Sequence, residues 1–360
     1  AGSLTETFLD PRATFIKEVT YRMTSAKNLN NAFRLINELR KRVSARETAK
    51  SMAEEVPTQE ALIKSPTPGA RLVNLNIRPT LGGGRRTLGT LEAHENGFRF
   101  TTAKKGVVDI IYRNIKHAFF QPAENELIVL LHFHLHHPII IGKKKTVDVQ
   151  FYTEVMEAST ALHRTSWGDQ DEIEEEQRER EMRNNLNMQF QNFVKKVEAF
   201  KPDEIEFDIP YRELGFYGVP HRANVLLQPT VHCLVNLVEA PFFVMTMDEI
   251  EIVYFERVEH GLKQFDAVFV KKDWRQMPIQ INAIPVDSLE PIKDWLDSIN
   301  IKFYEGKATI NWKNLMAQAR ANPRKFWEDG GWAQSSADFE ESEEEGEPDE
   351  YESEECSSHK

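Results

Sequence analysis

Residues 71–152 alternate short β-type runs with turn-forming residues, and this rhythm limits the fold more than any other feature of the sequence. Runs rich in β-branched and aromatic residues predict strands at 71–78, 87–94, 98–103, 107–112, 116–121, 126–137 and 146–152. The turn signals between them are "GGG" (82–84), "ENG" (95–97), "KKG" (104–106), "PAEN" (122–125) and "GKKK" (142–145). A helix is expected near 153–163. Seven strands closed by one helix are typical of a pleckstrin-homology-like barrel, which we place at 71–165.

A second series of short predicted strands, spaced like the first, follows a long helical segment. Residues 171–200 predict a helix whose apolar stripe should pack on a neighbouring barrel; the stripe is Met182, Leu186, Phe190, Phe193, Val197 and Phe200. Strand-like runs then continue to about residue 285, and 288–299 predicts another closing helix. The runs are "EIEFDIPYR" (204–212), "VHCLVNLV" (231–238), "PFFVMTM" (241–247), "EIEIVYFERV" (249–258), "FDAVFVKKD" (265–273) and "IQINAIPV" (279–286). We therefore predict a mainly β chain with some α: tandem pleckstrin-homology-like barrels, each closed by a helix and joined by the long amphipathic helix. The connecting helix is placed at 166–200, and the second barrel with its C-terminal helices at 201–327.

The N-terminal region is too small to be a domain by itself. Residues 13–22 predict a strand, and 28–43 predict an amphipathic helix that Asn28 can cap. Residues 44–70 are polar and contain three prolines, so we expect a linker there. The chain is therefore expected to begin partway through a domain that ends near 43.

The negative charge of the chain is concentrated at its C-terminal end. The formal net charge is −12, and residues 338–355 contain twelve acidic residues and no basic one, so the rest is nearly neutral. Such a segment cannot bury enough apolar surface to fold alone, and we expect 328–360 to be a disordered acidic tail. It is either a solubilising tail or a polyanion that captures a basic partner. Phe339 and Tyr351, each flanked by acid, favour the second, because an aromatic side chain can anchor a partner.

The stretch "LLHFHLHHP" (130–138) raises the question of a metal site. His132, His134 and His136 alternate with Leu131, Phe133 and Leu135. A strand would place the three imidazoles on one face and the three apolar side chains on the other, in the barrel core. Zinc would need a fourth ligand, and neither a cysteine nor a helical His-x-x-x-His pair is near in sequence. We expect structural histidines, no metal and no cofactor.

Other motifs indicate binding rather than catalysis. "GGGRR" (82–86) lacks the spacing of a nucleotide-binding loop, and no nucleophile–base motif is present, so we predict a protein that is not an enzyme. Basic residues at turns could contact phosphate: Arg85, Arg86, Lys104, Lys105 and Lys143–Lys145. These support an alternative function, a phosphoinositide-binding membrane adaptor.

The nearly neutral charge of the chain outside the tail argues against strong general nucleic-acid affinity. The two cysteines, the lack of a membrane span and the lack of a signal-peptide pattern favour a reducing compartment.

Several uninterrupted blocks resemble the large subunit of the FACT histone chaperone, in order and from about 13 to 355. They include "GTLEAHENGFRFTT", "NIKHAFFQPAENELIVLLHFHL", "GKKKTVDVQFYTEV", "IEFDIPYRELGFYGVPHR", "INAIPVDSLEPIKDWL" and "GGW" before the acidic tail. The resemblance implies a middle domain of two fused barrels and a nuclear, chromosome-associated protein. It implies that residues 1–43 end a heterodimerisation domain that pairs, in the full-length protein, with the small FACT subunit; that pairing is doubtful for this chain, which lacks most of the domain.

The same resemblance implies partners and site residues. The tail would bind the 2A–2B histone dimer, and the middle domain would bind histones 3 and 4, with any DNA contact weak or indirect. Phe339 and Tyr351 both match the tail's anchoring pattern. The acidic residues expected around them are Asp338, Glu340, Glu343, Glu344, Glu345, Asp349, Glu350 and Glu352. A further histone contact after the second barrel has as candidates Trp312, Leu315, Met316, Phe326 and Trp327, although core packing is the favoured role for each.

Overall fold

The computed structural model describes residues 25–55, 59–65, 69–81, 88–103, 106–124, 126–142, 144–155, 171–201 and 203–333. The chain divides into two units, 1–57 and 58–360, which are considered separately. The strand predicted at 13–22 and the acidic tail beyond 333 lie outside the described residues. So does all but the start of the helix predicted near 153–163.

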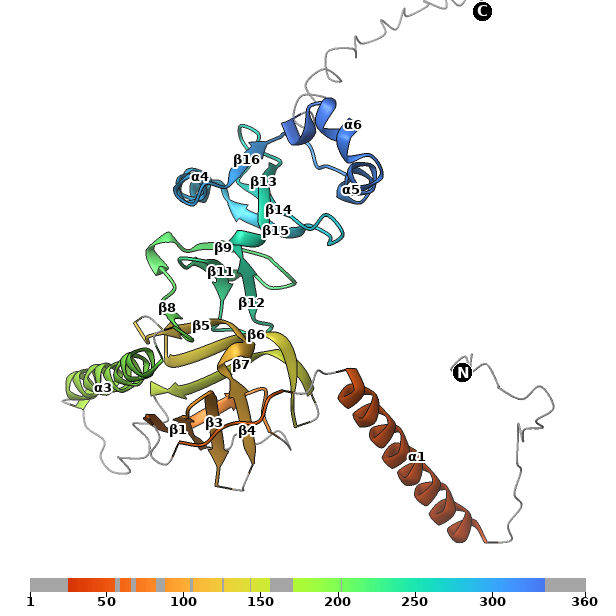
Figure 1. Cartoon of the computed structure of the whole chain (residues 1–360), viewed down its shortest axis with the longest axis vertical. Helices are drawn as coiled ribbons and strands as arrows, with labels where there is room; N and C mark the ends of the chain where they lie inside the picture. The colour runs from red at the N-terminus through yellow and green to blue at the C-terminus, as the bar shows by residue number, and fades with distance from the viewer. Residues whose placement is uncertain are drawn as a thin grey trace, which may run out of the picture. The chain divides into compact units, whose positions relative to one another are not determined.

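The described residues of the first unit form one long helix, α1 (Ala26–Glu55), drawn in red in Figure 1. It was predicted to end at 43, and it continues for twelve more residues into the segment expected to be a linker. The reason lies in residues 45–55, which are mostly alanine, arginine, glutamate, lysine and methionine, all good helix formers. The first proline after the start of α1 is Pro57. Helix propensity and the cost of proline therefore set the end of α1. The polar composition of residues 44–55 did not by itself indicate a linker.

The seven strands predicted in the first β series are all present, within a few residues of their expected bounds. They are β1 (Ala70–Arg78), β2 (Gly89–Ala93), β3 (Gly97–Thr102), β4 (Val107–Ile111), β5 (Ile115–Gln121), β6 (Ile128–Ile141) and β7 (Lys144–Glu154). With β8 (Phe207–Asp208) they form one bent sheet in the order β4-β3-β2-β1-β7-β6-β5-β8. β1 makes the bend, because its first half pairs with β2 and its second half with β7. Within the described part of the chain, β4 and β8 remain as open edges, so the hydrogen bonds do not close the expected barrel.

The core of this first module is sealed by α3 (Asp171–Phe200), as the apolar stripe predicted. Phe190, Phe193 and Val197 are buried among the strands' aromatic side chains, including Phe98, whose ring centroid lies 6.1 Å from that of Phe193. Phe200, the last member of the stripe, is exposed. β7 extends to Glu154, so a helix cannot begin at 153 as expected.

The second module contains two four-stranded sheets. One has the order β12-β11-β10-β9 and the other β15-β14-β13-β16. Their bounds are β9 (Phe216–Gly218), β10 (Val225–Pro229), β11 (Cys233–Asn236), β12 (Phe243–Thr246), β13 (Ile250–Glu256), β14 (Gln264–Lys271), β15 (Ile279–Pro285) and β16 (Lys302–Glu305). The helix expected at 288–299 is α4 (Leu289–Ser298), and its Leu289, Ile292, Trp295 and Leu296 enter the core between the sheets. β9, β10 and β16 were not predicted, and β16 pairs parallel to β13 after the chain has passed through α4.

Two short helices, α5 (Trp312–Ala321) and α6 (Pro323–Glu328), follow β16. Their apolar side chains pack on Ile252, Tyr254, Val268 and Val270, the side chains of β13 and β14 that do not enter the main core. Short 3-10 turns lie at Tyr112–Asn114, Arg212–Leu214, Met247–Glu249, Val286–Ser288 and Gly331–Ala333. The last turn buries Trp332, so ordered structure extends past 328, where the tail was expected to start.

The two modules are joined by an apolar cluster of their own, which we call the junction. Phe119, Leu130 and Tyr152 come from β5, β6 and β7, and Cys233, Val235 and Leu237 come from the second module. All six side chains are at most 3% exposed. Since burial of apolar surface is the main favourable term in folding, the modules stabilise one another through this contact.

Candidate functional site

The histidine strand β6 lies with one face in the first core and the other at the junction. Leu131, Phe133 and Leu135 are buried in the first core, as the alternation predicted. His132 is fully buried on the opposite face, where the ring of Phe242 from the second module meets it edge-on, 5.0 Å between centroids. His134 is partly buried and His136 is exposed, so this face runs outward from the junction to solvent.

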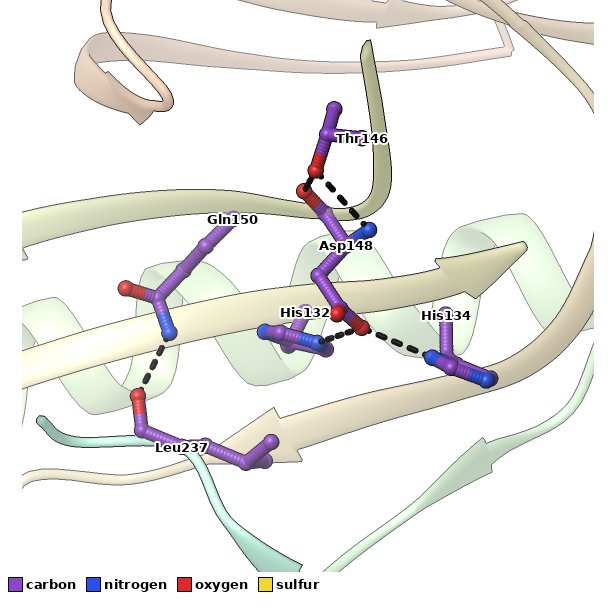
Figure 2. Close-up of polar contacts among 6 residues, drawn as sticks. All are labelled: His132, His134, Thr146, Asp148, Gln150 and Leu237. Carbon is purple, nitrogen blue, oxygen red and sulfur yellow. Dashed lines mark hydrogen bonds and ion pairs between the residues drawn. The ribbon is translucent and has the colours of Figure 1, made fainter. Parts of the chain in front are cut away.

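The two inner histidines share one carboxylate, as Figure 2 shows. Nε2 of His132 lies 3.2 Å from Oδ1 of Asp148, and Nδ1 of His134 lies 2.7 Å from the same oxygen. Thr146 fixes the strand at this point, because its hydroxyl contacts the carbonyl oxygen of Asp148 at 2.7 Å. A carboxylate between two imidazole rings is a hydrogen-bonding arrangement, and Asp148 was not foreseen from the sequence.

The electrostatics of this cluster indicate a structural role. Burial lowers the pKa of His132, and Asp148 opposes that shift, so the buried imidazole is neutral. Burial disfavours the charged form of Asp148, but the hydrogen bonds from His132 and His134 outweigh it and hold the pKa of that carboxyl well below its usual range. Among the described residues, no group of three or more His, Cys, Asp or Glu side chains is placed to hold a metal ion.

Polar contacts extend the junction beyond its apolar cluster. Nε2 of Gln150 donates to the carbonyl oxygen of Leu237 at 2.7 Å, and Nη1 of Arg78 donates to that of Val238 at 3.2 Å. The Arg78 guanidinium also lies 4.0 Å from the ring centroid of Tyr152. These bonds are directional, so they fix the geometry of the contact that the apolar cluster stabilises.

Side chains of β5 make further polar contacts to the second module. Lys116 forms an ion pair with Glu249, and Nε2 of His117 lies 2.9 Å from Oγ1 of Thr246. Burial, with smaller effects from nearby cations, lowers the pKa of His117 to about 4. The neutral ring is therefore the form present at neutral pH, and it connects the two modules.

A second concentration of aromatic side chains, here called the aromatic cap, lies over β13 and β14. It consists of Trp274, Trp312, Phe326, Trp327 and Trp332. Trp274 is at its centre, with ring centroids 5.6 Å from those of Phe326 and Trp332 and 6.2 Å from that of Trp327. Glu251 of β13 accepts hydrogen bonds from the indole nitrogens of Trp274 and Trp332. Sequence reasoning missed Trp274, Trp332 and Glu251, and the only signal was the position of Trp332 after two glycines.

Those glycines allow the cap to form. Gly330 and Gly331 both have positive φ, 105° and 60°, a conformation that strongly favours glycine. A Cβ on Gly331 would lie 2.6 Å from the Trp327 ring. The glycine pair therefore turns the chain back so that Trp332 can enter the cap.

The five candidates after the second barrel have different surroundings. Trp312 and Met316 are buried, and Leu315 and Phe326 pack partly buried against them. Trp327 is 53% exposed and is followed by Glu328 and Asp329, while Arg324 and Lys325 precede the two aromatic residues on α6. Of the five, Trp327 offers the largest accessible apolar surface to a partner.

Other predicted site residues are not described. Phe339, Tyr351 and the acidic residues around them lie beyond 333, and Arg85, Arg86, Lys104, Lys105 and Lys143 fall in gaps of the described ranges. Lys144 and Lys145 are exposed at the start of β7. No helix among the described residues is long and apolar enough to span a bilayer. The membrane-adaptor alternative rests mainly on residues in these gaps and stays a prediction.

Comparisons with known proteins agree over most of the chain. A family model described as "FACT complex subunit SPT16 PH-like domain" matches residues 70–197, and one described as "FACT complex subunit (SPT16/CDC68)" matches 1–62. A third, described as "Histone chaperone Rttp106-like, middle domain", matches 217–305. The first match confirms the pleckstrin-homology-like fold predicted for the first module.

Curated relatives point the same way. FACT complex subunit SPT16 of Dictyostelium discoideum is 48% identical over 330 residues, which are 91% of this chain and 31% of that protein. The subunit of Oryza sativa subsp. japonica is 47% identical over 332 residues, 89% and 31% of the two chains. FACT complex subunit spt-16 of Caenorhabditis elegans is 44% identical over 339 residues, 91% and 33%. The chain spans about a third of the length of the curated relatives it matches.

Proposed function

The chain belongs to the SPT16 family of FACT complex subunits, and on that premise we propose that it is a non-enzymatic, histone-binding part of such a subunit. The observation that carries the proposal is the match of residues 217–305 to a model named for a histone chaperone's middle domain, followed by a strongly acidic segment. Histones are the abundant basic proteins that such a polyanion fits.

The proposed mechanism begins with the tail. Its twelve carboxylates stand in for DNA phosphates on the basic surface of the 2A–2B histone dimer, which speeds encounter without fixing register. Phe339 and Tyr351 supply the anchors that fix register, because a buried aromatic contributes more than a rim charge. Ordering such a tail costs free energy, which keeps the affinity moderate for the area covered.

The two modules supply the second contact in this proposal, to histones 3 and 4. The junction supports this, because side chains packed this tightly present one continuous surface rather than two independent ones. Covering histone surfaces that DNA otherwise occupies permits nucleosome disassembly, and retaining the histones permits reassembly, in transcription, replication and repair. The site of action is the nucleus, on chromosomes, with DNA contacted weakly or indirectly.

The proposal extends to the second FACT subunit only for the full-length protein. Residues 1–62 match an SPT16 family model, and in the intact subunit the domain to which they belong would pair with the small FACT subunit. The exposed apolar side chains of α1, such as Phe33 and Ile36, support the idea that this helix normally packs against further structure.

Titration of the 2A–2B histone dimer at near-physiological salt tests the tail mechanism. The full chain is compared with a chain cut after Ala337 and with the double variant Phe339→Ala, Tyr351→Ala. We expect both changes to weaken binding by about 2 kcal/mol or more. If only the cut weakens binding, the tail acts as an unspecific polyanion and the anchor assignment is wrong. If neither change has an effect, the tail is not the dimer's binding site.

A further inference from the structure

The segment that joins the two modules exposes large apolar side chains on a fixed backbone. β8 pairs with β5 through Phe207, and the backbone N–H of Tyr211 donates to the carbonyl oxygen of Pro229 at 2.8 Å. Tyr217 pairs with Leu226 across β9 and β10. In Figure 1 the segment leads from β8, beside β5, to β9 in the second module. It is therefore held along its whole length.

Four side chains of this segment form what we call the ledge: Ile209, Tyr211, Leu214 and Tyr217. They are 46%, 50%, 47% and 52% exposed. Leu127 of the first module, 50% exposed, follows Glu126, which bonds Arg212 at 2.9 Å and so lies at the same place. Single exposed apolar residues are ordinary, but this many within nine residues, including two tyrosines, is typical of a binding surface.

Carboxylates outnumber cations on the segment that carries the ledge. Asp203, Glu204, Glu206 and Glu213 are exposed carboxylates on the same segment. Arg212 is paired with Glu126, and Lys201 lies 4.0 Å from Glu204. The next exposed guanidinium along the chain, that of Arg222, lies past β9 in the turn to β10. The ledge is thus an apolar strip on an acidic segment.

We propose that the ledge binds a lysine- and arginine-rich protein segment that also carries apolar side chains. The apolar side chains would bury the tyrosines, and the cations would meet the carboxylates at the rim, the usual anatomy of a specific interface. The chain's own acidic tail and a second copy of the ledge are disfavoured, because each would bring like charge against the carboxylates. The inference rests on the proposed function, under which a core histone supplies the basic segment.

The test uses the full chain and two variants with exposed substitutions. One is Tyr211→Ser with Tyr217→Ser, and the other is Glu206→Gln with Glu213→Gln. Fluorescence anisotropy with the labelled histone 3–4 tetramer and, separately, the labelled 2A–2B dimer gives Kd at several salt concentrations. We expect the tyrosine variant to raise Kd about tenfold or more for one of the two assemblies. We expect the carboxylate variant to raise Kd mainly at low salt, because screening already weakens its contribution at high salt.

The matched control is Leu262→Ser with Val286→Ser, a pair of exposed apolar residues elsewhere on the second module. It should leave Kd unchanged, and thermal unfolding should show that all variants fold as the parent does. If the parent binds histones and both ledge variants bind equally well, or if the control loses as much affinity, the ledge assignment is overturned and the proposed function remains. If the parent chain binds neither assembly, the proposed function is contradicted, and the ledge proposal that rests on it is overturned with it.

Discussion

Glu256 accepts hydrogen bonds from Nε1 of Trp312 at 2.7 Å and from the backbone N–H of Ile310 at 2.9 Å. The carboxyl group is at the end of β13 and only 1% exposed. A buried carboxylate is expensive unless it is hydrogen-bonded, so these two bonds are a condition for the fold of this region. They hold the start of α5 against β13, in the sheet β15-β14-β13-β16.

Replacing Trp312 by phenylalanine should therefore destabilise the protein. The ring would still fill most of the space, but the buried carboxylate of Glu256 would lose a donor, and we expect a loss of about 2 kcal/mol. Urea unfolding followed by circular dichroism measures the change. Trp327→Phe is the matched control, since Trp327 is exposed and no hydrogen bond from its indole nitrogen is described; its effect should stay within about 0.5 kcal/mol. Equal losses for the two variants would contradict this interpretation of the aromatic cap.

Trp327 should matter for binding instead. Under the proposed function, Trp327→Ala weakens histone binding about threefold or more while the unfolding free energy stays within about 1 kcal/mol of the parent's. Met316→Ala in the same segment should do the reverse, because Met316 is 1% exposed and its truncation leaves a cavity. Histone titration and urea unfolding of both variants separate the two roles. A Trp327 variant that binds histones like the parent would remove this residue from the binding surface.

His117 makes stability depend on pH. Its pKa is lowered to about 4 by burial and nearby cations, whereas the unfolded chain takes up the proton near pH 6.5. The folded state therefore binds fewer protons between these values, and stability falls as pH decreases from about 7 towards 4. From pH 7 to pH 5 the loss from this residue is about 2 kcal/mol. His117→Gln keeps a group able to bond Thr246 but cannot titrate, so its unfolding free energy should show a smaller slope in this pH range. An unchanged slope would mean that the ring accepts its proton in the folded state.

Truncating a side chain in the junction should destabilise the protein more than truncating an exposed side chain. Phe119 is fully buried in it, and Phe119→Ala should cost about 3–5 kcal/mol through lost burial and the cavity left behind. Because the cluster includes side chains from both modules, the whole of 59–333 should lose stability together. Hydrogen exchange can follow amides of β6 and β11 separately, and increased exchange confined to β6 would contradict this coupling.

The first module was predictable because its strands are long enough for their alternation and are separated by strong turn signals. The alternation in β6 correctly assigned Leu131, Phe133 and Leu135 to the core, but it could not show that His132 is buried as well. That burial depends on Phe242, more than a hundred residues away, and no local pattern contains it. The same limit concealed Asp148, which reaches His132 and His134 from the neighbouring strand.

The second module was predicted less completely for two physical reasons. β9 and β16 have three and four residues, too few for a period to be visible, and β16 is added to its sheet in parallel after a helix. Of the aromatic cap, Trp312, Phe326 and Trp327 were singled out from the sequence, but Trp332 was assigned to the tail. Its burial depends on the backbone turn at Gly330 and Gly331, which brings it back to Glu251. The tail residues themselves remain predictions.

The junction also determines how this protein can be divided. Cutting the chain near residue 201 would leave Phe119, Leu130 and Tyr152 on one piece and Cys233, Val235 and Leu237 on the other, all facing water. It would also strip Gln150 and Leu237 of the bond they share. Ile205, Phe207 and β8 would also be lost from the first core and sheet. Each half would then expose apolar surface and be prone to self-association. The two modules therefore behave as one structural unit. An insertion, a fusion or a new partner has to leave the contact between them intact.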